Sequence, residues 1–325
     1  MSKQAKSIVK IVLPLLLGVV LVWYSLSQIS LAELADYFKN ANYTWVGLGV
    51  VLGILSHLSR AYRWKFMINP LGYKLHLPNS FMAVMAAYLI NYTIPRAGEI
   101  SRASIVANYE GIPFEKGFGT IVAERIADLV MILLIIAITL FLEFDYIYKF
   151  FAERFDPYKI LFGVLGLIIL FVVFVVFINR SNSKIALKIK DFVAGLIEGV
   201  LSIFRMQQKW AFIGHTVFIW LMYVLMFYVT TFAVDETSGL PFAAILIGFI
   251  SGSFSIAATN GGVGSYPVAI FAAFSVFGIA KEPSIGFGYI MWAAQTLMVI
   301  VLGGLSLLFL PIYNKNRKTS NKELT

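Results

Sequence analysis

Long apolar stretches recur along this chain, with short polar segments between them. A membrane-spanning helix needs about 20 mostly apolar residues, because it must cross roughly 30 Å of hydrocarbon. Six stretches are predicted to span: Ile8 to Leu26, Trp45 to Ser59, Thr120 to Leu142, Ile160 to Ile178, Phe212 to Phe232 and Ile285 to Leu310. The pattern predicts an all-α polytopic membrane protein with about six spanning helices.

Two further apolar regions are interrupted by Pro or Gly. Leu77 to Ile94 breaks at Pro95 to Glu99 and resumes as Ile100 to Asn108, and Phe242 to Ala258 breaks at Asn260 to Gly264 and resumes as Tyr266 to Phe277. A break frees backbone groups that hydrocarbon cannot satisfy, so it is tolerated only beside protein or water. We interpret both regions as re-entrant helical hairpins. The alternative is a pair of spans joined by a surface loop.

Composition agrees with a membrane protein, since 59% of the 325 residues are hydrophobic and only 13% are charged. Soluble domains carry about a quarter charged residues. The net charge of +9 arises from Lys and Arg in loops, so we expect no nucleic-acid partner. Cysteine is absent, which excludes disulfides and thiol catalysis.

The distribution of charge predicts the orientation in the membrane. With a cytoplasmic N-terminus, the inner loops hold the basic residues Lys3, Lys6, Lys10, Arg60, Arg63, Lys65, Lys74, Arg180, Lys184, Lys188, Lys190, Arg205, Lys209, Lys315, Arg317, Lys318 and Lys322. The outer loops hold the acidic residues Glu33, Asp36, Glu143, Asp145, Glu153, Asp156, Asp235 and Glu236. The positive-inside rule therefore places both termini on the cytoplasmic side of the cytoplasmic (inner) membrane, with each hairpin returning to the side it enters from.

The elements then repeat in inverted order: two spans, a hairpin from inside and a span, followed by two spans, a hairpin from outside and a span. We expect a single transmembrane domain over residues 1–325, with inverted halves of about 1–145 and 146–325. No residue-level identity links the halves, so this repeat is inferred from topology alone. Inverted repeats with interrupted helices at matching positions indicate a transport site near the bilayer midplane.

Two features are expected at the cytoplasmic surface. The segment from Lys184 to Arg205 has lysines opposite an apolar face, which predicts an amphipathic helix on the inner leaflet or, equally well, a connector packed on the bundle. Tyr62, Trp64 and Trp210 suit an interfacial aromatic belt and are expected to mark depth without chemistry.

Charged side chains gather beside the first break. Arg96 and Glu99 flank Gly98, Arg102 follows one turn later, and Glu124, Arg125 and Asp128 begin the third span. Charges at membrane depth are costly and usually functional or paired. We expect the arginines and the helix N-terminus after Gly98 to bind a phosphate-bearing headgroup, while Glu99, Glu124 or Asp128 binds an amine or a coupling proton. The alternative is a set of structural ion pairs.

The second break contains Asn260, Gly261, Gly262 and Gly264. It lacks the Gly-Lys-Ser/Thr ending and the preceding strand of a nucleotide-binding loop, so nucleotide binding is rejected. Its small residues would let a lipid headgroup approach the backbone, or would simply allow close helix packing.

The histidines His57, His76 and His215 are scattered and offer no metal-binding spacing, so no metal or cofactor is expected. His57 lies one turn before Arg60 and is a further candidate for lining the polar path.

Asn91-Tyr92-Thr93-Ile94-Pro95-Arg96-Ala97-Gly98-Glu99-Ile100-Ser101-Arg102, followed by Glu124-Arg125-Ile126-Ala127-Asp128, resembles the signature of the lysylphosphatidylglycerol synthase transmembrane-region family. That family includes the flippase half of the bacterial multiple peptide resistance factor. The resemblance implies a lipid-translocating fold with re-entrant hairpins, and it adds Asn91 to the candidate substrate-binding residues.

Two departures from the family pattern matter. The second hairpin of the family usually reads Pro-Gly-Gly-x-Gly and soon meets a Glu, whereas this chain has Asn260 and Pro267 at those places. A mechanism that needs a carboxylate from the second half is therefore in doubt. Synthase members also carry a soluble aminoacyl-transferase domain, which we do not expect here because about 15 residues follow the last predicted span.

The charged residues beside the first break, together with what the resemblance implies, predict a transporter and not an enzyme. It would move a phosphate-headed lipid, either a phospholipid or a polyprenyl-phosphate-linked lipid, between leaflets by alternating access around Arg96, Glu99 and the Glu124 to Asp128 cluster. The alternatives are a non-catalytic membrane partner of a glycosyl- or aminoacyl-transferase, or an intramembrane enzyme acting on lipid headgroups. The expected partners are the lipid itself and either a second copy of the chain or a lipid-modifying enzyme.

Overall fold

The structure is a computed structural model that describes residues 18–94, 97–144, 148–149, 156–181 and 183–322. These residues are mainly helical and contain no strand, which confirms the all-α class. Their contacts divide the chain into two compact units, residues 1–124 with 210–325 and residues 125–209. The inverted halves that meet near residue 145 stay a prediction.

Four helical segments are long and apolar enough to cross a membrane: Tyr43–Leu71, Phe114–Leu142, Lys209–Thr231 and Lys281–Lys315. They correspond to α3 (Tyr43–Ile68) with the short η1 (Asn69–Leu71), α6 (Phe114–Leu142), α10 (Lys209–Thr231) and most of α13 (Lys281–Lys322). A helix at Gly18–Leu26 bends by 84° into α2 (Leu31–Asn40), and this pair would be a fifth span. A helical multi-pass membrane protein is therefore confirmed, while the count of six spans stays a prediction. Residues 8–17 of the predicted first span lie outside the described residues.

Helix α3 continues well past the end of its predicted span at Ser59. No Gly or Pro interrupts the chain until Pro70, so the helix extends to Ile68 before η1 and Gly72, which adopts φ 84°, close it. The placement of Arg60 and Arg63 in an inner loop was therefore wrong. Both lie within α3 and are buried, with 2% and 0% of their surface exposed.

The first interrupted region folds as a hairpin of two short helices, α4 (Leu77–Thr93) and α5 (Gly98–Glu110), which pack on each other. Their 17 and 13 residues correspond to about 26 and 20 Å, less than the roughly 30 Å of a bilayer core. The Asn91 side chain accepts a hydrogen bond from the Gly98 backbone N–H at 2.7 Å. A Cβ at Gly98 would collide with the Ala87 carbonyl, so glycine permits this close approach of α5 to α4.

The second interrupted region forms a similar hairpin from α11 (Phe242–Ala258) and α12 (Ser265–Ser275). Gly261, Gly262 and Gly264 in the connection adopt φ of 68°, 79° and 69°, a region that glycine occupies without the steric cost of a side chain. Beside them, the Ser265 hydroxyl lies 2.6 Å from that of Ser255 and 3.0 Å from that of Thr259. Hydroxyl pairs therefore hold the two short helices together at the turn.

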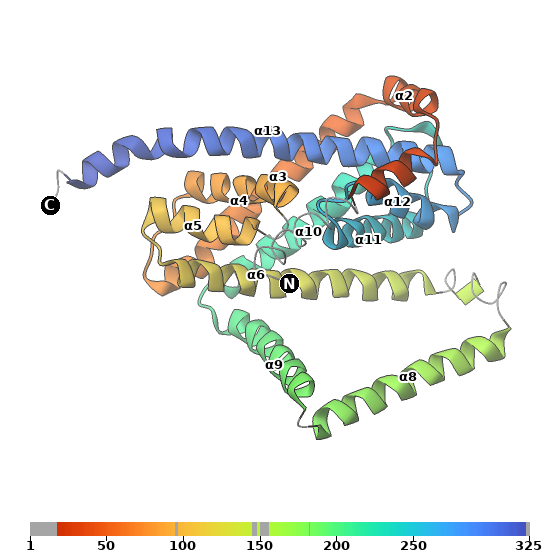
Figure 1. The fold of residues 1–325 in the computed structure, drawn as a ribbon, viewed down its shortest axis with the longest axis horizontal. Helices are drawn as coiled ribbons and strands as arrows, with labels where there is room; N and C mark the ends of the chain where they lie inside the picture. Colours follow the sequence, from red (N-terminus) through yellow and green to blue (C-terminus); the bar gives the residue numbers. More distant parts are fainter. Residues whose placement is uncertain (1–17, 95–96, 145–147, 150–155, 182, 323–325) are drawn as a thin grey trace, which may run out of the picture. The chain divides into compact units, whose positions relative to one another are not determined.

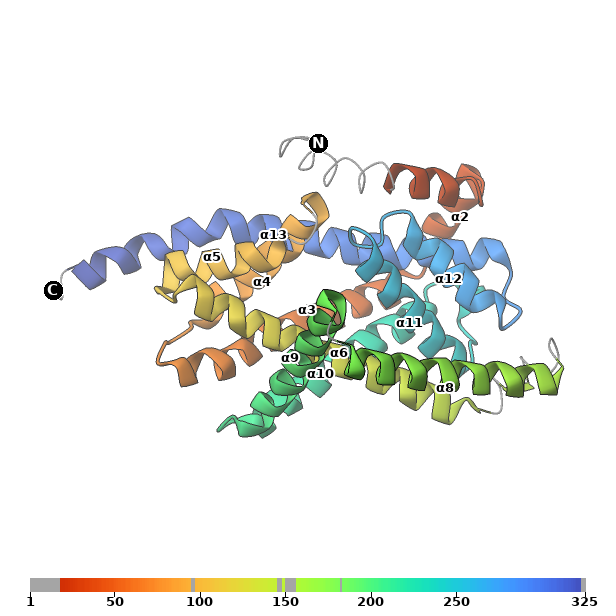
Figure 2. The same ribbon diagram turned by 60° about the horizontal axis from the view of Figure 1, so that its bottom comes forward.

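Helix α13 lies along both hairpins, against α4 and α12, and it also contacts α2 and α3 (Figures 1 and 2). Glycines set its close approach to α4, because a Cβ at Gly303 would lie 2.8 Å from the Met85 carbonyl oxygen and 2.6 Å from Leu89 Cβ. Gly286 faces the Tyr37 ring of α2 in the same way. This helix is therefore the common support of the two hairpins.

In the second unit, α8 (Pro157–Arg180) covers the predicted span Ile160 to Ile178, and α9 (Lys184–Arg205) is the next helix along the chain (Figure 1). The bounds of α9 match the predicted amphipathic helix. Its Lys190 Nζ donates to the backbone oxygens of Asn179 at 2.9 Å and Ser181 at 3.1 Å. Lys190 thereby caps the C-terminal end of α8, where carbonyl groups lack helical partners.

Candidate functional site

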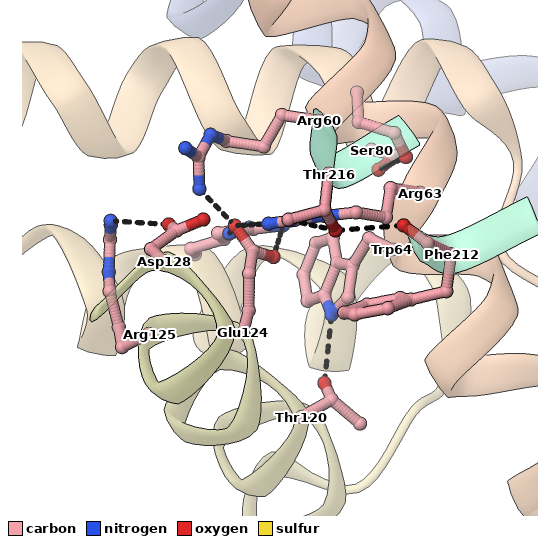
Figure 3. A network of polar contacts seen from close by, with 12 residues as sticks. Arg60, Arg63, Trp64, Ser80, Thr120, Glu124, Arg125, Asp128, Phe212 and Thr216 are labelled. Carbon is pink, nitrogen blue, oxygen red and sulfur yellow. Dashed lines mark hydrogen bonds and ion pairs between the residues drawn. The ribbon is translucent and has the colours of Figure 1, made fainter. Parts of the chain in front are cut away.

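Glu124, in the first half of α6, is fully buried and binds three arginine side chains, of which Figure 3 labels Arg60 and Arg63. Arg60 Nη1 lies 2.5 Å from Glu124 Oε1, and Arg63 Nη2 lies 3.3 Å from the same oxygen. Arg102 of α5 donates to both carboxylate oxygens, at 3.2 and 3.0 Å. We call Arg60, Arg63, Arg102 and Glu124 the arginine cluster.

The local sequence explains how these side chains converge. Arg60 and Arg63 are three residues apart in α3, so they project from neighbouring positions on one helix surface. Arg102 comes one turn after the glycine that opens α5, and the hairpin holds α5 against α4, which packs on α3. Three segments that are distant in the sequence therefore place their charged side chains in contact at one buried position.

The Trp64 ring packs against one arginine of the cluster. The Arg102 Cζ atom lies 3.9 Å from the centroid of the Trp64 ring, a close cation–π contact. The indole Nε1 donates to Thr120 Oγ1 at 2.8 Å, and that hydroxyl donates to the Gly117 carbonyl at 2.7 Å. Trp64 is completely buried, so the expectation that it marks the membrane interface was wrong.

Helix α10 orients the Arg63 side chain through a hydrogen bond and a ring contact. Arg63 Nη1 donates to Thr216 Oγ1 at 2.7 Å, and Thr216 donates to the Phe212 carbonyl at 2.8 Å. The Phe212 ring lies 5.0 Å from the Arg63 Cζ atom. The cluster thus connects α3, α5, α6 and α10, and its guanidinium groups are held in defined orientations.

The chemistry of the cluster favours anions. Its three guanidinium groups and one carboxylate carry a formal charge of +2. Guanidinium presents several N–H donors in a planar fork that matches the oxygens of a phosphate or carboxylate. The site can therefore hold an anionic group in exchange for, or alongside, Glu124.

The other predicted residues of the first half are placed differently. Arg96 lies outside the described residues. Asn91 is occupied by its hydrogen bond to Gly98, and Glu99 is half-buried in the first turn of α5. In the second unit, Arg125 and the buried Asp128 pair at 3.6 Å. The structure thus brings Arg102 and Glu124 together, and it adds Arg60, Arg63, Trp64 and Thr216, which the sequence reasoning did not assign to a site.

At the second break, the glycines allow close packing. A Cβ at Gly261 would collide with the Tyr92 ring of α4, and one at Gly264 would collide with the backbone of Leu21 and Val22. The Gly261 carbonyl accepts from Trp292 Nε1 at 2.9 Å, and Asn260 beside it is half-buried. The turn of the second hairpin therefore meets the end of α4 in the first.

Two of the three histidines, His76 and His215, have polar partners. His76 Nδ1 lies 2.8 Å from Glu110 Oε2, and His215 Nδ1 lies 2.8 Å from the Ser59 hydroxyl. Within the part of the chain that the structure describes, no group of His, Cys, Asp and Glu could hold a metal ion.

These features define a multi-pass helical membrane protein with a buried arginine cluster and two short helical hairpins. The chain belongs to the family described as the lysylphosphatidylglycerol synthase TM region, whose model matches residues 11–304. The resemblance seen in the two sequence motifs is thereby confirmed.

Two relatives extend this comparison. The UPF0104 membrane protein MJ1595 of Methanocaldococcus jannaschii is 24% identical over 334 residues, covering 93% of this chain and 96% of that protein. The glycosyltransferase AglD of Haloferax volcanii is 29% identical over 125 residues, covering 38% of this chain and 20% of that protein. No solved structure matches the chain.

Proposed function

We propose that this protein translocates a phosphate-headed lipid between the leaflets of the cytoplasmic membrane, and that the arginine cluster binds the phosphate. The observation that carries the proposal is the convergence of Arg60, Arg63 and Arg102 on the single buried carboxylate of Glu124. Burying ion pairs is costly and contributes little net stability, so such groups in a membrane protein are most often functional.

The proposed transport cycle exchanges one anion for another at the arginine cluster. Without lipid, Glu124 occupies the guanidinium groups, which keeps the positive charges paired inside the bundle. A headgroup phosphate that enters the site takes over part of this coordination, because phosphate accepts the same bidentate hydrogen bonds. The acyl or prenyl chains stay in hydrocarbon while the headgroup crosses the bundle.

The two hairpins supply the path in this proposal. Each consists of helices too short to cross the bilayer, so we interpret both as re-entrant, entering from opposite sides in an inverted repeat. Arg102 comes from the first hairpin, whose end meets the turn of the second at Tyr92 and Gly261. Movement of one hairpin against the other would open the arginine cluster to one leaflet at a time.

The orientation that goes with this path has six spans and both termini in the cytoplasm, as the charge distribution predicts. The sequence contains no Gly-Lys-Ser/Thr phosphate loop. Movement would therefore follow the lipid gradient or couple to ions, with Glu99 or Asp128 as the carboxylates that could carry a proton.

The lipid class is supported by the comparisons. The family description names a lysylphosphatidylglycerol synthase, so a phospholipid headgroup is the first candidate. The partial similarity to a protein named as a glycosyltransferase favours lipid-linked sugars instead and supports a second candidate function. In that case the chain would be a non-catalytic membrane partner of a glycosyltransferase. We assign no catalytic activity to the chain itself.

Translocation is tested with purified protein in liposomes that contain a fluorescent phosphatidylglycerol or a polyprenyl phosphate. Accessibility of the headgroup to an impermeant reagent reports its crossing. We expect wild type to move at least one of these lipids and Arg102→Gln to slow that movement about tenfold or more, because a charge-assisted hydrogen bond is lost.

Arg180→Ala is the matched control, since Arg180 is an exposed arginine at the end of α8, and it should move lipid at the wild-type rate. A correctly folded Arg102→Gln protein that transports like wild type would refute the site. Wild type that moves neither lipid, yet co-purifies with a glycosyltransferase, would favour the partner role.

A further inference from the structure

His57 lies in the middle of α3 with 6% of its surface exposed, one helical turn before Arg60 of the arginine cluster. Its ring nitrogen Nδ1 is buried and has no hydrogen-bond partner among the described residues. A buried polar atom without a partner loses its interaction with water and gains nothing in return. Such atoms are rare, and each one requires an explanation.

The neighbours of the His57 ring are aromatic and come from two other helices, α4 and α10. The His57 ring centroid lies 4.8 Å from that of Tyr88 in α4 and 6.0 Å from that of Tyr223 in α10. Trp220 packs edge-on against Tyr223, with ring centroids 6.1 Å apart. Tyr88 and Tyr223 are only half-buried, so both rings retain surface that a ligand can contact.

We propose that His57, Tyr88 and Tyr223 form a subsite, here called the His57 subsite, for the hydroxyl-bearing part of the lipid headgroup. This inference rests on the proposed function, because the phosphate of the same lipid would lie at the neighbouring arginine cluster. The lipid would be one whose phosphate carries a polyol, either glycerol or a sugar.

The chemistry separates this ligand from others. A neutral imidazole provides one donor and one acceptor, which suits a hydroxyl group that can play either role. Aromatic faces pack on the C–H surface of a polyol, and the hydroxyls of the polyol remain free to form hydrogen bonds with a polar side chain beside the rings. A cationic headgroup at this position would be repelled by Arg60, one turn away. A second anionic group would bind the charged guanidinium donors of the arginines in preference to the neutral His57 ring.

The test compares two pairs of lipids that differ only in the hydroxyl-bearing group. One pair is phosphatidic acid and phosphatidylglycerol, and the other is a polyprenyl phosphate and a polyprenyl-phosphate hexose. Dissociation constants are measured with the full chain in detergent or nanodiscs. We expect wild type to prefer the hydroxyl-bearing member of at least one pair by about tenfold, and the pair that shows the preference identifies glycerol or sugar.

Substitution at His57 shows whether this group is responsible. His57→Phe keeps a planar ring but removes both nitrogens, so it should abolish the preference and leave binding of the phosphate-only lipid unchanged. His57→Asn keeps a polar atom near the position of Nδ1 and should retain part of the preference. His215→Phe is the matched control, because His215 already pairs with Ser59. It should bind all four lipids like wild type.

Two results would overturn the subsite. One is a wild-type protein that shows no preference within either pair, which needs no variant to measure. The other is a His57→Phe protein that loses affinity equally for both members of a pair, which indicates a structural role. In either case, binding of the phosphate-only lipids that still depends on Arg102 leaves the proposed function standing. Failure of wild type to bind any of the four lipids would instead refute the proposed function.

Discussion

Arg102 and Glu124 form a bidentate pair between α5 and α6, with Nη1 to Oε1 at 3.2 Å and Nη2 to Oε2 at 3.0 Å. Both side chains are almost completely buried, at 3% and 0% exposure. This pair links the first hairpin to a membrane-spanning helix, so the position of the hairpin and the charge state of the site depend on each other.

Removing the carboxylate of Glu124 should be strongly destabilising, because it leaves buried guanidinium groups without their shared anion. We expect Glu124→Ala to lower stability by about 3–5 kcal/mol, measured as loss of the monodisperse protein on heating in detergent. The Arg102→Ala and Glu124→Ala double variant should lose less than the sum of the single variants, because they share one interaction. Strictly additive losses would mean that the pair contributes nothing as a unit.

Two adjacent glycines in α13 provide an internal comparison of helix packing. A Cβ at Gly303 would press on the backbone oxygen of Met85, whereas a Cβ at Gly304 meets nothing within 4 Å. We expect Gly303→Ala to lower the thermal midpoint through displacement of α13 from α4, a cost of about 1–3 kcal/mol. Gly304→Ala should be close to neutral. Equal effects at both positions would contradict the packing described for α13.

The contact between the two hairpins can be tested at Gly261. An alanine there is unfavourable twice, since φ is 68° and the Tyr92 ring occupies the space of the Cβ. We expect Gly261→Ala to lower the thermal midpoint of the protein. Addition of Tyr92→Ala should restore part of the loss, because it relieves the collision but not the backbone strain of roughly 1 kcal/mol.

Gly239→Ala is the control for the Gly261 experiment, since nothing lies within 4 Å of its added Cβ. No recovery in the double variant would show that Tyr92 does not cover this turn.

The topology can be mapped with single cysteines, because the sequence contains none. Cysteines at the exposed positions Ser27 and Ser238 should react with an impermeant maleimide from outside the cell, while those at Lys74 and Lys188 should react only after permeabilisation. Thr93→Cys at the end of α4 should react slowly from either side if the hairpin is re-entrant. Rapid labelling of Thr93→Cys from outside would support two full spans joined by a surface loop.

Hydrophobic periodicity was sufficient to locate most helices. The predicted ends of α9 agree with its observed bounds, and each interruption separates two short helices, because Gly and Pro act locally. Helices and their interruptions, which are encoded within about 20 consecutive residues, were therefore accessible from the sequence. The hydrogen bond between Gly98 and Asn91 was not predicted, although both residues lie in one motif.

The arginine cluster was only half predicted because its contacts are distant in the chain. Arg60 and Glu124 are separated by 64 residues and Arg63 and Thr216 by 153. The positive-inside rule assigned Arg60 and Arg63 to a cytoplasmic loop, because it counts basic residues and takes no account of a buried acidic partner such as Glu124. The absence of Gly and Pro between Ser59 and Pro70 was the available signal that α3 continues past Ser59 and includes both arginines.

The most direct test of phosphate binding at the arginine cluster is a cryo-electron microscopy structure of the protein in nanodiscs containing phosphatidylglycerol and a polyprenyl phosphate. The account predicts headgroup density whose phosphate lies within hydrogen-bonding distance of Arg60, Arg63 or Arg102. A map that resolves these side chains and the bound lipids, but places every headgroup away from the cluster with Glu124 still holding all three arginines, would contradict it.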